Sequence, residues 1–421
     1  MRRHTHIDME KRDFNGMQFL FKKSQSPVAY CALSIKSGTR HEDQTFGGIA
    51  HLTEHMIFKG TEYKSGRCIN SYIEKLGGEL NAFTTKEEIV IHSTVLKEDL
   101  ARAIGLLVEL AFCPKFQEKE LEKEKVVVMD EIISYKDSPS DQIFDDFEEL
   151  LFEETPLSMP VLGKSRTLKK IGTQELFAHV KRHFILSNMA FTVVADADES
   201  KVRNILHKAL LKYAPGAMES SAENSPQQLS IPPAMAPLRT FDRVVNRKGH
   251  QTHCIIGAQA YPYYDQKRIA LILLVNMLGG PAANSRLNTL LREKNALVYN
   301  VDAAYGQYSD TGIVTIYFGC DKQYYERCVR LVEGELERFR NIPLSDRALK
   351  SAKKQLLGQL AISSDNGEAQ CLSMGKSLLV FREVFSTGKM RSMIEAVTAS
   401  EIMEVASEIF APERICKLTY M

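Results

Sequence analysis

Two histidines and one glutamate within five consecutive residues form the pattern in this chain that is best suited to chemistry. His51 and His55 are four residues apart, so on a helix both imidazoles project from one face, where a single metal ion can bridge them. Glu54 stands beside them and can accept a proton from a metal-activated water. These residue types at this spacing predict metal-assisted hydrolysis, with a peptide bond as the expected target.

The surrounding residues favour a helix here, but they leave a second interpretation open. Gly47 and Gly48 precede the pattern and allow the helix start to approach a neighbouring backbone closely. Apolar residues follow at helical spacing, and Gly60 is expected to end the helix. So short a pattern also arises by chance, and a pair of surface or core-edge histidines remains the alternative until a third ligand is found.

The acid-rich segment 118–133 is the expected source of that third ligand. It is predicted to form one long helix, in which the early glutamates alternate with lysines as on a solvated surface. Glu124 and Glu131 are seven residues apart and therefore share a helical face. Glu131 follows three valines, where we expect the helix to be buried, and a buried carboxylate needs a partner such as a metal ion.

In combination these motifs resemble the pitrilysin/insulinase family of inverted zinc metallopeptidases. The resemblance rests on the segment from His51 to His55, on the position of Glu131 further along the chain, and on Asp137 and Pro139 just after the long helix. In length and layout the chain is most similar to the mitochondrial processing peptidase and its bacterial two-domain relatives. The resemblance covers nearly the whole chain.

The resemblance implies a role for each residue of the motif. His51, His55 and Glu131 would bind zinc, with one ion per chain. Glu54 would be the general base, and Glu124 would support the ligands from behind.

Four further residues are implied by the resemblance as substrate contacts. Arg292 and Tyr299 correspond to an arginine and a tyrosine that hold the substrate and polarise its reacting carbonyl. Asn81 and Ala82 lie where the family has a strand onto which an extended substrate adds as another strand. Without the resemblance, Arg292 and Tyr299 would be interpreted as structural residues, and Asn81-Ala82 as a turn that opens a strand.

Length and composition fit a protein of two domains. The chain has 421 residues, 44% of them hydrophobic, which is enough for two cores. We expect a zinc-binding catalytic domain at 1–214, a linker rich in proline, serine and alanine at 215–238, and a second similar domain at 239–421. The second domain lacks the histidine motif and would supply Arg292 and Tyr299.

Strand and helix patterns predict the α+β class. We expect a mainly antiparallel sheet covered by helices in each domain, and a clam-like half as the overall form.

Charge and hydropathy exclude several classes of partner. The 54 basic and 53 acidic residues nearly cancel, so neither a nucleic acid nor a membrane is an expected partner. No apolar run approaches the roughly 20 residues that span a bilayer. The polar first residues show no signal core, and the eight scattered cysteines contain no C-x-x-C pair. We therefore expect reduced core cysteines and a cytoplasmic location.

The sequence thus predicts a zinc-dependent endopeptidase that hydrolyses extended or unfolded peptides. A homodimer is expected, because one chain carries both the metal motif and the pair Arg292 and Tyr299. A non-catalytic or partner-dependent subunit of the same fold is the main alternative. A zinc-storage or regulatory protein is less well supported, because metal binding alone does not need Glu54.

Overall fold

The computed structural model describes residues 14–219, 240–247 and 249–421. These residues form two compact units, and each unit draws on both halves of the chain. The first unit contains residues 14–128, 161–219 and 364–384. The second unit contains residues 129–160, 240–247, 249–363 and 385–421.

The predicted division into 1–214 and 239–421 stays a prediction, because each unit groups separate segments. Within the predicted linker, Pro215–Glu219 is a short helix, α9, and 220–238 lies outside the described residues.

Each unit is built on a five-stranded sheet, and the two sheets have the same strand order. The first sheet has the order β1-β5-β2-β4-β3, which is Gln18–Lys23, Met189–Ala195, Val28–Ile35, Ile89–Leu96 and Glu79–Thr84. The second has the order β6-β10-β7-β9-β8, which is Asp242–Val245, Cys416–Tyr420, Gln251–Ala260, Gly312–Asp321 and Val298–Gln307. The pairs β1–β5 and β6–β10 are parallel, and the other pairs are antiparallel. The predicted α+β class with mainly antiparallel sheets is confirmed.

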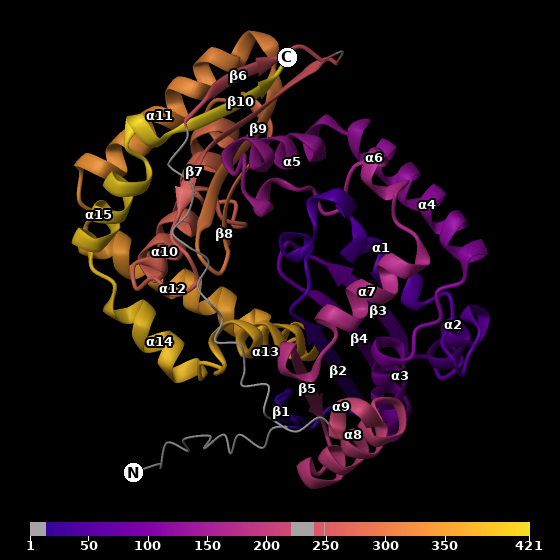
Figure 1. Cartoon of the computed structure of the whole chain (residues 1–421). Helices are drawn as coiled ribbons and strands as arrows, with labels where there is room; N and C mark the ends of the chain where they lie inside the picture. Colours follow the sequence, from indigo (N-terminus) through magenta and orange to yellow (C-terminus); the bar gives the residue numbers. More distant parts are fainter. Residues whose placement is uncertain (1–13, 220–239, 248) are drawn as a thin grey trace, which may run out of the picture. The chain divides into compact units, whose positions relative to one another are not determined.

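Helices cover the first sheet, and one of them comes from the far end of the sequence (Figure 1). α3 (Leu100–Phe112) packs on β2 and β4, and α13 (Gly367–Phe381) packs on β2 and β5. α13 lies very close to β2, since a Cβ atom added at Gly375 would be 2.5 Å from the Ser34 hydroxyl. All seven residues of β5 are buried, as expected for a strand with both faces covered.

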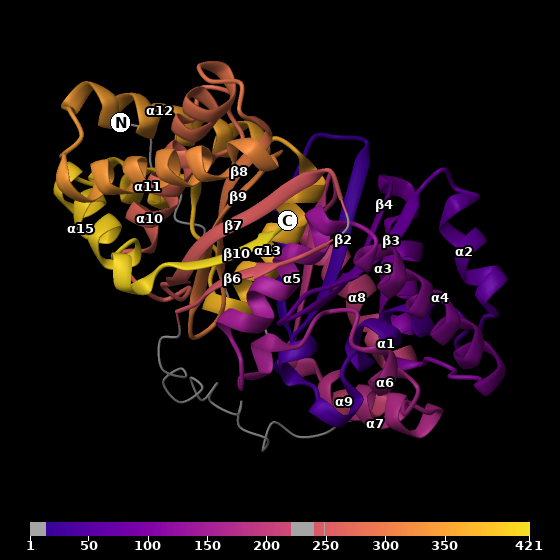
Figure 2. The same ribbon diagram turned by 90° about the horizontal axis from the view of Figure 1, so that it is seen from above.

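The second unit receives a helix from the first half of the chain in the same way. α5 (Pro139–Leu151) packs on β7 and β10 (Figure 2). Its Phe147 ring lies against Gly257 of β7, where an added Cβ atom would be 2.8 Å from the ring. α10 (Arg268–Gly279) packs on β8 and on α15 (Ala399–Ile409). The two halves of the chain have therefore exchanged helices α5 and α13.

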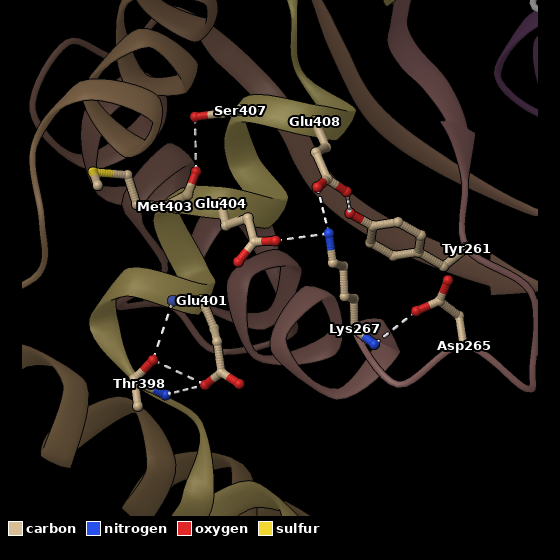
Figure 3. Close-up of polar contacts among 9 residues, drawn as sticks. All are labelled: Tyr261, Asp265, Lys267, Thr398, Glu401, Met403, Glu404, Ser407 and Glu408. Atoms are coloured by element: carbon tan, nitrogen blue, oxygen red, sulfur yellow. Dashed lines mark hydrogen bonds and ion pairs between the residues drawn. The ribbon is translucent and has the colours of Figure 1, made fainter.

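A charged network joins α15 to the turn before α10 (Figure 3). The Lys267 ammonium lies 2.7 Å from a Glu404 oxygen and also contacts Glu408. The Tyr261 hydroxyl donates to the second oxygen of Glu408. The bonds from Lys267 and Tyr261 lower the pKa of Glu408, and the backbone N–H of Lys267 donates to Asp265 at 2.7 Å. These contacts fix the chain where it leaves β7.

Eight cysteines are free in the structure, and seven of them are buried. The exception is Cys68, which is exposed on α2 (Gly66–Glu74). The prediction of core cysteines is therefore confirmed for seven and wrong for Cys68. In the part of the chain that the structure describes, none of the helices is both long and apolar enough to cross a membrane.

Three histidines pack together where α7 (Thr173–His183) meets the turn after β2. The ring centroids of His179 and His183 are 4.7 Å apart, and those of His41 and His183 are 6.3 Å apart. His41 Nδ1 accepts from the Gly38 N–H at 3.2 Å, so this contact needs an unprotonated nitrogen. Burial lowers the pKa of His41 and His179 to about 3 and that of His183 to about 4. α7 also contacts α1, the helix of the metal motif.

Acidification is expected to destabilise the metal-free protein through these histidines. They are neutral in the folded chain, and nearby Lys36, Arg40 and Arg182 oppose their protonation. Their contribution is complete above about pH 6.5, the ordinary histidine pKa, and it falls as the pH drops toward 4. Each proton taken up only on unfolding removes up to about 1.4 kcal/mol per pH unit.

Urea unfolding of the metal-free protein between pH 7.5 and 5 measures this loss. The variant His183→Gln should reduce the pH slope of the unfolding free energy by close to one proton. A slope identical to that of the wild-type protein would contradict this explanation.

Candidate metal centre

The histidine motif lies on α1 (Ile49–Ile57), whose start is fixed by a glycine and a carboxylate. Gly48 has φ +93°, and an added Cβ atom there would lie 2.9 Å from the Leu162 carbonyl oxygen. Glu42 accepts from the N–H groups of Gly48 and Ala50 at 2.8 and 2.7 Å. These N–H groups have no partner within the helix, so the two Glu42 oxygens satisfy them. Burial raises the pKa of Glu42 to about 8, so the stabilisation comes from these hydrogen bonds more than from a full negative charge.

α1 ends close to the predicted position. Phe58 is its C-cap, so the predicted end near Lys59-Gly60 is correct to within one residue, and only the predicted role of Gly60 as the C′ residue is wrong. The loop is held instead by the fully buried Glu109, which accepts from the Thr61 hydroxyl at 2.5 Å and pairs with Lys64. A long-range contact therefore holds the loop that follows α1.

The two faces of α1 differ as the motif requires. Leu52 and Met56 are fully buried in the core of the first unit. His51, Glu54 and His55 are half-buried and share the opposite face. The core contacts thus fix the direction in which the three polar side chains project.

α4 (Glu118–Lys136) is the predicted long helix, and it brings Glu131 to the two histidines. One ligand atom from each of His51, His55 and Glu131 lies within 4.8 Å of the other two. Among the described residues, this is the one group of three such side chains close enough to hold a metal ion. The structure therefore brings together three ligands that are widely separated in the sequence.

The burial of α4 differs from the expectation. Val126 and Val127 are 54% and 42% exposed, and Val128 is fully buried. Glu131 is only half-buried, whereas Glu124 is 6% exposed. The expectation that the whole valine run is buried is wrong, because two of the three valines project from the solvent side of the helix.

Glu124 connects α4 to α1. One of its carboxylate oxygens lies 3.2 Å from His55 Nδ1, and the other lies 2.8 Å from the Lys59 ammonium. A His55 Nδ1–H that donates to Glu124 leaves Nε2 with its lone pair for a metal ion. Glu124 was predicted to support the ligands from behind, and Lys59 was missed because no local pattern marks it.

Glu54 is held from a different element. The Thr84 hydroxyl donates to a Glu54 carboxylate oxygen at 2.6 Å. Thr84 is the last residue of β3, and Ala82 lies two residues before it on the same face of the strand. Sequence reasoning missed Thr84 as a site residue, although its alternation with Ala82 could have indicated a shared face.

The predicted substrate strand lies at an edge of its sheet. β3 is the terminal strand of the first sheet and pairs with β4. In that register Asn81 is opposite His92, and Ala82 is opposite Ile91. Asn81 is exposed and Ala82 is half-buried, so the two neighbouring side chains lie on opposite faces of the strand.

The donor set fits zinc. Burial, followed by the neighbouring His55, lowers the pKa of His51 to about 4, so the imidazole is neutral at physiological pH. Neutral imidazole is the form that binds a metal ion. Two imidazoles and one carboxylate are a ligand set of catalytic zinc sites, which keep a further position for water.

Arg292 and Tyr299 lie in the second unit. Arg292 is exposed on a π-helical turn, η6 (Asn288–Glu293), and such turns are rare and frequent at functional sites. Tyr299 is 59% exposed at an irregularity of β8, where its hydroxyl donates to Asp321 at 2.9 Å. This bond raises the pKa of Tyr299. The role of both residues with the metal ligands stays a prediction.

Solved structures share the fold of the whole chain. A protease from Helicobacter pylori superimposes with a TM-score of 0.85 at 18% identity, covering 96% of this chain and 97% of that protein. A Pseudomonas fluorescens structure described as a peptidase M16 inactive domain gives a TM-score of 0.86 at 18% identity, covering 97% of this chain and 96% of that one. At this identity the two structures establish the fold: two α+β units with one sheet each.

Sequence models assign the family. The model described as insulinase, peptidase family M16, matches residues 18–165, and the model described as the peptidase M16 inactive domain matches residues 170–356. The chain therefore belongs to peptidase family M16, the insulinase family. The predicted resemblance is confirmed.

Three relatives that match most of this chain are named as uncharacterized zinc proteases. Proteins named as uncharacterized zinc proteases from Rickettsia felis and Streptomyces coelicolor are 26% and 29% identical to this chain. The matches cover 90% and 88% of this chain and 89% and 80% of those proteins. A Bacillus subtilis protein with the same kind of name is 27% identical, over 90% of each chain.

Loss of the Glu124 carboxylate is expected to weaken zinc binding. In Glu124→Gln the ion pair with Lys59 is lost and the bond to His55 is weakened, which should reduce the zinc affinity roughly tenfold. Competition with a chromophoric chelator measures the affinity. Glu118→Gln, an exposed position on the same helix, is the matched control and should bind zinc like the wild-type protein. Equal affinities for the two variants would contradict the assigned role of Glu124.

Proposed function

We propose that this chain is a zinc-dependent endopeptidase that hydrolyses extended or unfolded peptides. The observation that carries the proposal is the group of three ligand atoms within 4.8 Å, contributed by His51, His55 and Glu131, with Glu54 on the same helical face as the histidines. Membership of peptidase family M16 and the zinc-protease names of the relatives support it.

The residues around the ligands suit hydrolysis. Zinc, when bound by His51, His55 and Glu131, would supply a Lewis acid that activates water and polarises the peptide carbonyl. Glu54 would accept the proton of the attacking water and pass it to the leaving amine. The Thr84 hydroxyl fixes the orientation of the Glu54 carboxylate through a bond of 2.6 Å, so the base does not need to rotate before it accepts the proton.

The edge strand β3 suits an extended substrate. A peptide that adds to this edge at Asn81 and Ala82 satisfies its backbone hydrogen bonds as a further strand. Thr84 belongs to the same strand and also contacts Glu54, so pairing would align the peptide with the general base. Recognition through backbone groups depends on extension more than on side-chain identity, which favours unfolded peptides as substrates.

Cleavage of a mixed peptide library tests the proposal. The zinc-loaded protein is expected to make internal cuts that mass spectrometry detects, whereas Glu54→Gln should retain zinc and lose turnover because it lacks the base. Zinc content is measured for both proteins. Cleavage by Glu54→Gln at the wild-type rate would refute the assigned base.

A second candidate function is a non-catalytic or partner-dependent subunit of the same fold. The match of residues 170–356 to a model described as an inactive domain favours it. If all peptides remain intact while the wild-type protein contains zinc, this candidate replaces the endopeptidase. Addition of a related partner chain would then be required for cleavage.

Tyr299 is proposed to stabilise the oxyanion of the reaction, with Arg292 holding the substrate backbone. In Tyr299→Phe the turnover number should fall by about 100-fold, as for loss of one oxyanion donor, with zinc affinity retained. Tyr264→Phe, another exposed tyrosine of the second unit, is the matched control. An unchanged turnover number in Tyr299→Phe would show that the hydroxyl has no part in the reaction.

A homodimer is the proposed assembly, because one chain carries both the metal ligands and the pair Arg292 and Tyr299. Sedimentation of the purified, zinc-loaded protein is expected to give twice the mass of 47.5 kDa for the chain. An active species that sediments strictly as a monomer would contradict this assembly.

A further inference from the structure

The side chain of Lys59 reaches from the loop after α1 to helix α4. Its ammonium lies 2.8 Å from one oxygen of the Glu124 carboxylate, and the other oxygen lies 3.2 Å from His55 Nδ1. The Lys59 side chain is 33% exposed, whereas Glu124 is buried. Lys59 is therefore in direct contact with the residue that holds His55, although it is not one of the three candidate ligands.

The backbone around Lys59 is held by both neighbouring helices. The Lys59 N–H donates to the Met56 carbonyl of α1 at 3.1 Å. Gly66, the first residue of α2, packs so closely that an added Cβ atom would lie 3.0 Å from the Lys59 carbonyl oxygen. Glycine permits this approach because it has no Cβ atom. The Lys59 side chain thus starts from a fixed backbone position within reach of Glu124.

The two lysines next to Glu124 on α4 have other partners. Each pairs with a glutamate of its own helix at 2.7 Å, Lys123 with Glu120 and Lys125 with Glu122. One residue along a helix is a turn of about 100°, so these two lysines project in other directions than Glu124 does. The cation that meets the Glu124 carboxylate comes instead from the segment of His55, four residues after it in the sequence.

The contacts of the Glu124 carboxylate determine which nitrogen of His55 carries the proton. An ionised carboxylate only accepts hydrogen bonds, so the contact with Glu124 requires the proton on Nδ1 and leaves the Nε2 lone pair for a metal ion. The last torsion of a glutamate side chain is broad, so a carboxylate held at one oxygen alone turns easily. The contact between Lys59 and the second oxygen removes this freedom.

We propose that Lys59 is a positioning residue of the metal centre, which holds the Glu124 carboxylate in the orientation that selects the Nδ1–H tautomer of His55. This inference rests on the zinc site of the proposed function and adds to it a residue that does not bind the metal. Without the Lys59 ammonium, a fraction of His55 carries its proton on Nε2, and that proton must move before the nitrogen binds zinc.

Zinc affinity, measured by competition with a chromophoric chelator, gives the first test. In Lys59→Met the affinity should fall by roughly 3- to 10-fold, at or below the low end of the 10- to 100-fold that is typical for loss of a direct partner of a ligand. Lys59→Arg retains a cation and should restore most of the affinity. Lys119→Met, at an exposed lysine of α4, is the matched control and should bind zinc like the wild-type protein.

A double-mutant cycle shows whether Lys59 acts through Glu124. In the Glu124→Gln background, Lys59→Met should cause little further loss of zinc affinity, because the carboxylate that the lysine positions is already absent. Equal losses from Lys59→Met in the two backgrounds would overturn the proposal. A loss in Lys59→Arg as large as that in Lys59→Met would overturn it as well.

The tautomer of His55 is measured in the metal-free protein, independently of zinc and of peptide cleavage. Ring-nitrogen NMR shifts of protein labelled with ¹⁵N-histidine are recorded at pH 8, and His55 is assigned from the signals that His55→Gln lacks. The wild-type protein should show the Nδ1–H form, and Lys59→Met should show a mixture with the Nε2–H form. A general loss of stability would not produce this change in a protein that remains folded by circular dichroism.

The outcomes separate this inference from the proposed function. A wild-type protein that binds no zinc would refute the metal centre itself. Zinc binding that Lys59→Met leaves unchanged would refute only the role of Lys59. An Nε2–H form of His55 in the wild-type protein would overturn the proposal without reference to the folding of any variant.

Discussion

The contact between Glu124 of α4 and His55 of α1 is the interaction on which the candidate metal centre depends. Glu124 is 6% exposed and divides its two oxygens between His55 at 3.2 Å and Lys59 at 2.8 Å. Glu131 follows on the same helix at a distance of about 10 Å along the axis. The buried contact thus sets the register of α4 against α1. Without that register the third ligand would not lie beside the two histidines.

The elements that hold the site are predictable where one local pattern determines them. α4 was predicted as one long helix at 118–133 and is observed at Glu118–Lys136, because its helical pattern is continuous along the sequence. The exchange of α5 and α13 was not predictable, since an amphipathic helix shows that it covers a sheet but not which sheet. Thr84 and Lys59 were missed for a related reason, because their partners Glu54 and Glu124 are distant in the sequence.

The exchange of helices also connects the two halves of the chain energetically. The first sheet has Ser34 of β2 against Gly375 of α13, and the second has Gly257 of β7 against Phe147 of α5. Each sheet would expose apolar surface if only its own half of the chain were present. The packing of the first sheet therefore depends on a helix from the second half of the chain. The histidine motif lies in the first half of the chain and Arg292 and Tyr299 lie in the second, but this division does not imply that the two halves fold separately.

X-ray diffraction from zinc-loaded crystals at the zinc absorption edge tests the central claim most directly. The account predicts one anomalous peak per chain, about 2.0–2.2 Å from a nitrogen of His51, a nitrogen of His55 and an oxygen of Glu131. A peak at other residues, or a metal bound by the two histidines without Glu131, would contradict the assignment of the site.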